Sequence, residues 1–370
     1  MEIKPKGNQC QWHWRKSGIL LKFLIFMLLT IGIGTIVYVT FFLPIEHGAC
    51  GNTAQYRIVG RTLFIDGIGK MEDYWLPSEA KTIGLQEPPW WNHHHRITRI
   101  VISEGITDIG LYAFYQFRYL KTVVIPESVW YISGWSFQDC ESLEEVYAPG
   151  VYCVDFNAFQ DCSSLREVEL ASGSDGYTVL GEGVFRGCEE LETILMHSSV
   201  FLEEKCFYGC SSLGGLDYLN PERVGAYALA GCTSLTSFPT ERTREDPSIP
   251  PDPRRGSFAP SAFLNCTGLT RAELPASAET VPEAMFRGCS GLTEVIIPEG
   301  ITSIGPNAFR NCTGIEDLTI PASVIQIAED AFSGWTSAQT IRFQCNPSVV
   351  GGRLETDAKI IYEAPRISGE

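Results

Sequence analysis

The sequence predicts a β-rich α/β solenoid of about ten coils, preceded by a small β-module and a single transmembrane helix. Two observations carry this prediction: one unit recurs every 22 or 23 residues over most of the chain, and one long apolar segment stands near its start. Repeats of this length are typical of solenoids, in which each unit buries its apolar residues against its neighbours. With 44% hydrophobic residues, the 370-residue chain has ample apolar surface for a continuous core.

The segment near the N-terminus predicts a membrane anchor. Phe23–Leu43 holds 21 residues without a charge, and a helix of this length spans about 31 Å, which matches a bilayer core. Residues 1–22 carry a net charge of +4, whereas the remaining 348 residues carry −20. The positive-inside rule therefore predicts a cytoplasmic tail at 1–17, a transmembrane anchor at 18–43 and an exported remainder. A cleaved signal peptide is the alternative, and it would make the protein secreted.

Each repeat unit is marked by a buried phenylalanine and by a short strand. In residues 301–321, ITSIGPNAFRNCTGIEDLTIP, the predicted strand holds Leu318 and Ile320 and ends at Pro321. The pair Ile301 and Ile304 and the Ala-Phe step are expected to pack from the other walls of the coil. These units predict a solenoid over residues 97–345. The marker positions are Phe114, Phe137, Phe159, Phe185, Phe207, Leu229, Phe263, Phe286, Phe309 and Phe332.

Two segments depart from the regular period. The step of 34 residues between Leu229 and Phe263 contains 239–257, which is rich in proline and mixed in charge and therefore predicts a surface loop. Residues 346–370 predict a C-terminal cap and tail, in which Lys359–Tyr362 supplies a last strand that closes the open edge.

A cysteine follows the marker by three residues in eight units. Because Phe117 and Trp335 occupy the same position at the two ends of the array, the position is predicted to be a buried apolar slot that holds free thiols. Disulfides between neighbouring coils are the alternative, since export permits oxidation. A metal site is not predicted, because thiols along an array do not cluster as ligands do. The eight residues are Cys140, Cys162, Cys188, Cys210, Cys232, Cys266, Cys289 and Cys312.

The repeat unit I-x-x-I-G-x-x-A-F-x-x-C-x-x-L-x-x-V-x-I-P resembles that of the BspA-like leucine-rich repeat proteins, and 301–321 matches it almost position for position. The segment before the array also resembles this family: Cys50-Gly51, then RTLFIDGIGKMEDY at 61–74, then Pro89-Trp90. The resemblance covers residues 50–345. It implies a leucine-rich-repeat solenoid with a parallel β face, a β-module within 44–96, a microbial surface protein that attaches to host proteins or other cells, and no enzyme activity. Residues 200–238 fit the repeat poorly, which predicts local irregularity.

Charge and motif content narrow the function further. A strongly acidic exported region disfavours nucleic acid and anionic membrane surfaces as partners. The sequence contains no phosphate-binding loop, GxSxG or HExxH motif, so no enzyme activity, catalytic residue, cofactor or metal is predicted. The three consecutive histidines His93–His95 cannot all reach one ion from a strand, because alternate side chains diverge, and they predict an exposed loop. The expected partners are extracellular or cell-surface proteins.

The outward positions of the strands predict a binding face. Glu145 and Glu167 fall at the same position in adjacent coils, and Val124 and Tyr147 form an apolar spot beside them. We hypothesise that this acidic and aromatic face docks a basic or amphipathic partner. The alternative for this face is a solvated surface that keeps the array soluble. The alternative function for the whole chain is a non-catalytic scaffold of the cell envelope. The candidate site residues are Val124, Glu144, Glu145, Tyr147, Glu167 and Glu169.

Overall fold

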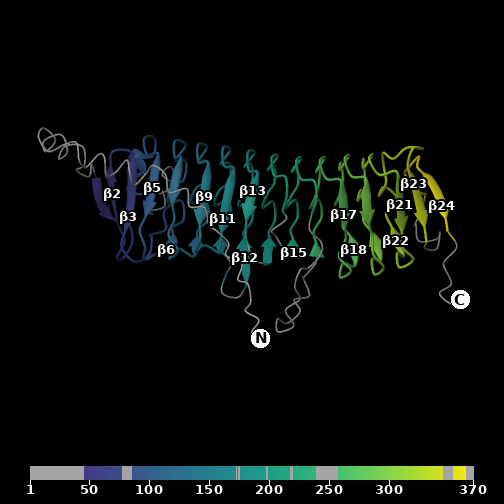
Figure 1. Cartoon of the computed structure of the whole chain (residues 1–370), viewed down its shortest axis with the longest axis horizontal. Helices are drawn as coiled ribbons and strands as arrows, with labels where there is room; N and C mark the ends of the chain where they lie inside the picture. The colour runs from purple at the N-terminus through teal and green to yellow at the C-terminus, as the bar shows by residue number, and fades with distance from the viewer. Residues whose placement is uncertain are drawn as a thin grey trace, which may run out of the picture.

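In a computed structural model, the protein forms an elongated stack of coils (Figure 1). The structure describes residues 46–76, 86–171, 173, 176–196, 199–216, 220–238, 257–344 and 353–363. The predicted tail at 1–17, the predicted anchor at 18–43 and nearly all of the predicted loop at 239–257 lie outside these ranges. Within them, no helix combines the length and the hydropathy needed to cross a membrane.

A small antiparallel β-module forms the N-terminal end of the stack. The strands β1 (Glu46–Ala49), β2 (Gln55–Val59) and β3 (Thr62–Asp66) form a meander, and β3 then pairs in parallel with the first strand of the array. Trp90 covers the core at this end. Its side chain is fully buried, and its indole N–H donates a hydrogen bond of 2.7 Å to the carbonyl of Ala113. The module is therefore continuous with the solenoid core.

The first sheet forms one wall of the solenoid. It runs in the order β1-β2-β3-β5-β7-β9-β11-β13 and stops where residues 214–216 and 236–238 form no strand, as the irregular repeats predict. Shorter ladders then continue this wall to the C-terminal end. The strands are β5 (Arg99–Ile102), β7 (Thr122–Val124), β9 (Glu145–Ala148), β11 (Glu167–Leu170), β13 (Thr193–Leu195), β17 (Arg271–Glu273), β19 (Glu294–Ile296), β21 (Asp317–Ile320), β23 (Thr340–Phe343) and β24 (Lys359–Tyr362).

The second sheet forms the neighbouring wall. Its order is β4-β6-β8-β10-β12-β14-β15-β16, and a three-stranded ladder, β18-β20-β22, follows it. Its strands are short because each coil turns after two to five residues. They are β4 (Gly69–Lys70), β6 (Ile106–Ile109), β8 (Tyr131–Ile132), β10 (Cys153–Val154), β12 (Tyr177–Leu180), β14 (Ser199–Leu202), β15 (Asn220–Val224), β16 (Ser257–Phe258), β18 (Thr280–Val281), β20 (Ser303–Ile304) and β22 (Gln326–Ile327).

The third wall consists of tight turns, so the α/β part of the predicted fold class is wrong. Around Phe114, Tyr112 and Gln116 have φ values of 52° and 58°, and this pattern recurs in most coils. The N–H groups of Phe114 and Gln116 donate to carbonyls of the next coil, those of Ser136 and Gln138, over 2.8 Å. In an α-helix, these N–H groups would instead bond to carbonyls four residues earlier in the same helix. Among the described residues, the one helical segment is a 3-10 turn, η1 (Trp91–His93).

The marker phenylalanines and the slot cysteines form two files through the core. Phe137 and Phe159, for example, stack at 5.1 Å between ring centroids with an angle of 2°, and both are fully buried. The described slot thiols are free and buried, which confirms the prediction. Each donates to the carbonyl of the marker residue one coil earlier, at 2.9 Å for Cys312 and Phe286. Burial raises the pKa of the Cys312 thiol to about 12, so this thiol stays protonated at neutral pH.

Candidate functional site

The outer surface of the first sheet brings together most of the residues that the sequence predicts to bind a partner. Val124, Tyr147 and Glu169 lie in register on β7, β9 and β11. Glu145 and Glu167, here called the acidic pair, lie in register on β9 and β11. Side chains in register on parallel strands project from the same side of the sheet about 4.8 Å apart, so these residues share one surface.

The row through Tyr147 is mostly apolar, and we call it the central row. Tyr147 and Val124 have 57% and 42% of their surface exposed. The register of β3, β5 and β7 adds Phe64 and Val101 to this row, and that of β11 and β13 adds Leu195 beyond Glu169. The members, in order, are Phe64, Val101, Val124, Tyr147, Glu169 and Leu195.

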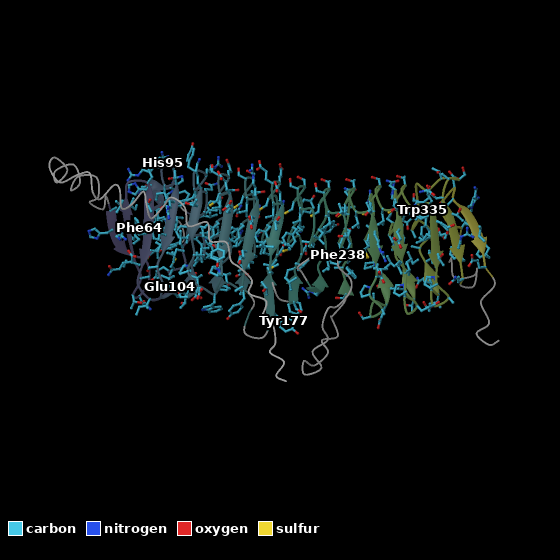
Figure 2. The ribbon with its side chains drawn as sticks, viewed as in Figure 1. Phe64, His95, Glu104, Tyr177, Phe238 and Trp335 are labelled. Atoms are coloured by element: carbon cyan, nitrogen blue, oxygen red, sulfur yellow. The ribbon has the colours of Figure 1, made fainter. Side chains whose placement is uncertain are left out.

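Three members of this row, Phe64, Val101 and Leu195, are not among the site residues predicted from the sequence, and Phe64 lies outside the repeats. It belongs to the β-module, at the N-terminal end of the solenoid in Figure 2, and Arg57 lies over its ring at 3.9 Å. The alternation of buried and outward residues in Thr62–Asp66 marks a strand with one exposed face. It does not show that this strand pairs in parallel with β5, because that pairing crosses more than thirty residues of sequence.

The acidic pair has no compensating cation within the part of the chain that the structure describes. Glu145 and Glu167 are both exposed, and neither joins an ion pair there. Glu144 stands just before β9, outside the rows, and its backbone carbonyl accepts the N–H of Arg166 at 2.8 Å. The guanidinium of Arg166, the nearest arginine along the chain, instead binds Glu190 at 2.8 Å.

Further along the same wall, acidic side chains are paired with arginines. Arg271 lies in register with Glu294, with 3.7 Å between the charged groups, and Arg342 binds Asp317 at 2.8 Å. Two like charges about 5 Å apart repel by roughly 1 kcal/mol in water and more near a protein surface. The acidic pair therefore costs stability, and a cationic partner would relieve this cost.

The three histidines do not form a metal site in the structure. His93 hydrogen-bonds to Glu46 of the β-module, and the ring of His94 stacks on Trp91 at 4.2 Å. Only His95 is exposed, so the predicted exposed loop is in fact a half-buried turn (Figure 2). Among the described residues, no group of three or more histidine, cysteine or acidic side chains could hold a metal ion.

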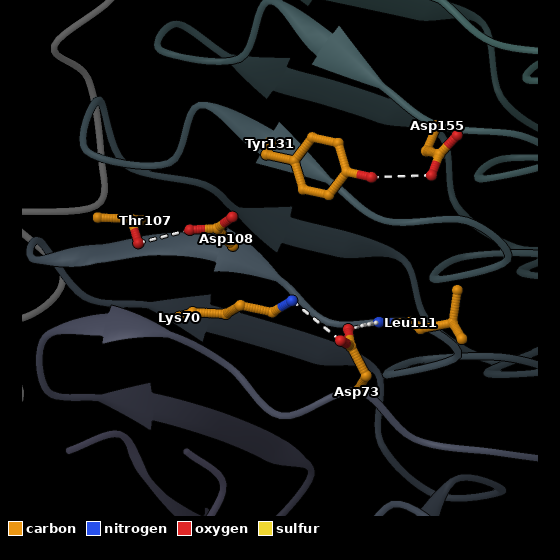
Figure 3. A network of polar contacts seen from close by, with 7 residues as sticks. All are labelled: Lys70, Asp73, Thr107, Asp108, Leu111, Tyr131 and Asp155. Atoms are coloured by element: carbon orange, nitrogen blue, oxygen red, sulfur yellow. Dashed lines mark hydrogen bonds and ion pairs between the residues drawn. The ribbon is translucent and has the colours of Figure 1, made fainter. Parts of the chain in front are cut away.

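A polar network on the second wall serves to join neighbouring coils (Figure 3). The phenol of Tyr131 donates to Asp155 over 2.8 Å, and burial, together with this hydrogen bond, raises the pKa of Tyr131. Asp73 of the β-module binds Lys70 at 2.9 Å and accepts the N–H of Leu111 at 3.0 Å. A phenol with a raised pKa is a weaker acid and stays protonated at neutral pH. These contacts tie the module and the coils together.

The parallel ladders, the files of phenylalanine and cysteine and the outward rows define a leucine-rich-repeat β-solenoid. Residues 90–214 and 256–354 match the BspA type leucine rich repeat region in six copies. Because this match covers more than half of the sequence, the chain belongs to that family. No curated protein matches it.

The solved structures that match this chain come from several bacteria. A leucine rich cell surface protein from Faecalibacterium prausnitzii is 22% identical, with a TM-score of 0.40, over 87% of this chain and 96% of that one. A leucine-rich repeat protein from Bacteroides ovatus is 20% identical, with a TM-score of 0.42, over 86% and 92%. The pneumococcal vaccine antigen PcpA is 15% identical, with a TM-score of 0.39, over 88% and 90%.

Proposed function

We propose that this chain is a membrane-anchored, extracellular protein-binding solenoid that attaches to proteins of a host or neighbouring cell surface. The observation that carries the proposal is the acidic pair beside the exposed ring of Tyr147. Like charges directly opposite each other on one sheet face are destabilising. A face that keeps such a pair without a cation, next to an exposed aromatic side chain, is suited to a partner that supplies the missing charge.

The chemistry of the face defines the kind of partner. Lysine or arginine side chains would bind the carboxylates of Glu145 and Glu167, and an apolar side chain would pack on Tyr147 and Val124. Tyrosine is enriched in protein interfaces, because its ring supplies apolar area and its hydroxyl a hydrogen bond. A basic or amphipathic segment of a protein meets both requirements. Charge attraction would speed its association and make binding sensitive to salt.

The extracellular location rests on the predicted anchor at 18–43 and the basic residues that precede it. The resemblance to surface proteins of the family agrees with it. Exposure outside the cell suits a long, rigid array, since a surface formed by many coils can meet a large protein partner.

The test is a binding screen with the full chain in detergent micelles against purified extracellular-matrix and cell-surface proteins, at low and at physiological salt. The site variant carries Glu145→Gln, Glu167→Gln and Tyr147→Ser. A matched control carries Glu104→Gln, Glu279→Gln and Tyr208→Ser, three exposed residues of the same types outside the first sheet.

The proposal expects a salt-sensitive partner that the control retains and the site variant loses by tenfold or more in affinity. A partner held equally by both variants would remove this face from the proposal. A chain that captures no protein in the screen would favour the alternative of a structural envelope scaffold.

A further inference from the structure

The two ends of the solenoid differ in how the core is covered. At the N-terminal end the β-module and Trp90 close it. At the other end, β24 pairs in parallel with β23, and no described strand pairs with its far side. Ile360 and Tyr362 of β24 lie in register with Ile341 and Phe343, which are fully buried, yet they are 39% and 51% exposed. The apolar core therefore reaches the surface along this strand.

The backbone of β24 also offers unused hydrogen-bonding groups. The N–H groups of Lys359 and Glu363 donate to the preceding coil, to the carbonyls of Gln339 and Phe343, at 2.9 and 2.8 Å. Because alternate residues of a strand direct their N–H and C=O groups to opposite edges, those of Ile360 and Tyr362 point to the open edge. An exposed apolar edge of this kind is a template for pairing with another strand.

The order of side chains along this edge is complementary to itself. Lys359, Ile360, Ile361, Tyr362 and Glu363 read as a cation, three apolar residues and an anion, centred on Ile361. If a second copy pairs in antiparallel about Ile361, Lys359 of each copy faces Glu363 of the other, whose carboxylate also lies 3.6 Å from Arg342 of its own chain. Ile360 then faces Tyr362 of the other copy, and these are the edge-directed residues that exchange hydrogen bonds.

The neighbouring register is less favourable. Two copies centred on Ile360 would place Glu363 of one copy opposite Asp357 of the other, and like charges directly opposite are destabilising. Pairing about Ile361 is therefore the register that satisfies the charges, the apolar core residues and the backbone together.

We propose that β24 is a self-association edge, through which two copies of the chain join end to end about a two-fold axis at Ile361. This interface is separate from the proposed partner face and does not depend on it. The β-module and β24 lie at opposite ends of the stack (Figure 1), about 70 Å apart at roughly 4.8 Å per strand. Together with the anchor predicted at 18–43, such a dimer would place its two anchors at far ends, as a bridge between opposed membranes requires.

The first test uses cysteine cross-linking of the full chain in detergent micelles. The Ile361→Cys variant places two thiols opposite each other on the two-fold axis, at a non-hydrogen-bonded position where the Cβ atoms are close enough for a disulfide. Ile325→Cys, at a side chain that is 70% exposed on another coil, is the matched control. Ile361→Cys is expected to give a disulfide-linked dimer on non-reducing gels at micromolar concentration. Equal cross-linking of both variants, or of neither, overturns the proposal.

The second test exchanges the charges. Lys359→Glu places glutamates opposite each other in a dimer, and Glu363→Lys does the same with lysines. Each variant alone is expected to dimerise at least roughly tenfold more weakly by sedimentation, because two like-charged pairs form in each dimer. An equimolar mixture of the two variants restores both attractive pairs and is expected to dimerise again.

Two results would overturn the proposal here. One is a dimer that neither single variant weakens. The other is a full chain that stays monomeric while a chain shortened after Glu363 dimerises, since the segment 364–370 would then occupy the edge in place of a second copy.

Discussion

The indole N–H of Trp335 donates a hydrogen bond of 2.8 Å to the carbonyl oxygen of Phe309, the same contact that a cysteine thiol makes in the coils before it. In the preceding coil, for example, the thiol of Cys312 donates to the carbonyl of Phe286. In these coils, the slot therefore holds an apolar side chain that also donates a hydrogen bond. Phe117, at the other end of the array, fills the slot by packing alone.

The donor in this slot is expected to contribute to stability. Trp335→Phe keeps an aromatic ring but removes the N–H group, and should lower the free energy of unfolding by about 1 kcal/mol. Trp130→Phe is the control, because the ring of Trp130 is 40% exposed. Thermal unfolding followed by circular dichroism compares the two. Equal losses for both variants would mean that the bond to Phe309 adds nothing measurable.

The thiol file predicts loss of stability in alkaline solution. Burial raises the pKa of Cys312 to about 12, from 9.0, and also raises those of Cys210 and Cys289. Below pH 9 these three thiols are protonated in both the folded and the unfolded state, and their contribution is intact. Above it, the unfolded chain releases protons that the folded chain retains, so stability should fall by about 1.4 kcal/mol per pH unit for each thiol, until the folded pKa is reached.

Urea unfolding under reducing conditions between pH 8 and 10.5 measures this slope. Cys312→Ala should reduce the slope by the share of one thiol, although it lowers stability at every pH. A slope that stays the same in this variant would show that the thiol is not the titrating group.

The acidic pair predicts a gain in stability on charge reversal. Glu145→Lys puts a cation in register with Glu167 and should stabilise the fold by roughly 0.2–1 kcal/mol. Glu294→Lys, on the same wall, breaks the pair with Arg271 and should change stability in the opposite direction. Melting temperatures at low salt test both, and the differences should shrink at high salt. If Glu145→Lys destabilises the fold, the carboxylates do not repel each other as inferred.

The close contact between the β-module and the array is expected to tolerate no added side chain. A Cβ atom at Gly110 would lie 1.8 Å from the backbone carbonyl oxygen of Glu72, so Gly110→Ala must force the module away from the first coil. The expected cost is about 1–3 kcal/mol, as for overpacked cores. Gly214→Ala, where the nearest atom lies at 4.0 Å, should change little. Similar melting temperatures for both variants would contradict a rigid contact here.

Much of the fold could be predicted from local features of the sequence. The period of 22 or 23 residues and the alternation within strands such as Glu167–Leu170 identify the core-facing residues, because side-chain direction in a strand depends only on position. The exchange of cysteine for Trp335 identified a buried slot. The rows that hold Glu145, Glu167 and Tyr147 also followed from the period, since in-register stacking puts equivalent positions side by side.

The tertiary structure determined the contacts between segments that are distant in sequence. The turns of the third wall replace helices because their N–H groups bond to the next coil, which no local pattern reports. The register of β3 with β5 adds Phe64 to the central row, and the placement of Arg166 on Glu190 leaves the acidic pair without a cation. The exposure of Ile360 and Tyr362 likewise depends on which strands flank β24. Sequence periodicity determined which side chains face inward, whereas register and neighbours across coils determined which charges and edges remain available.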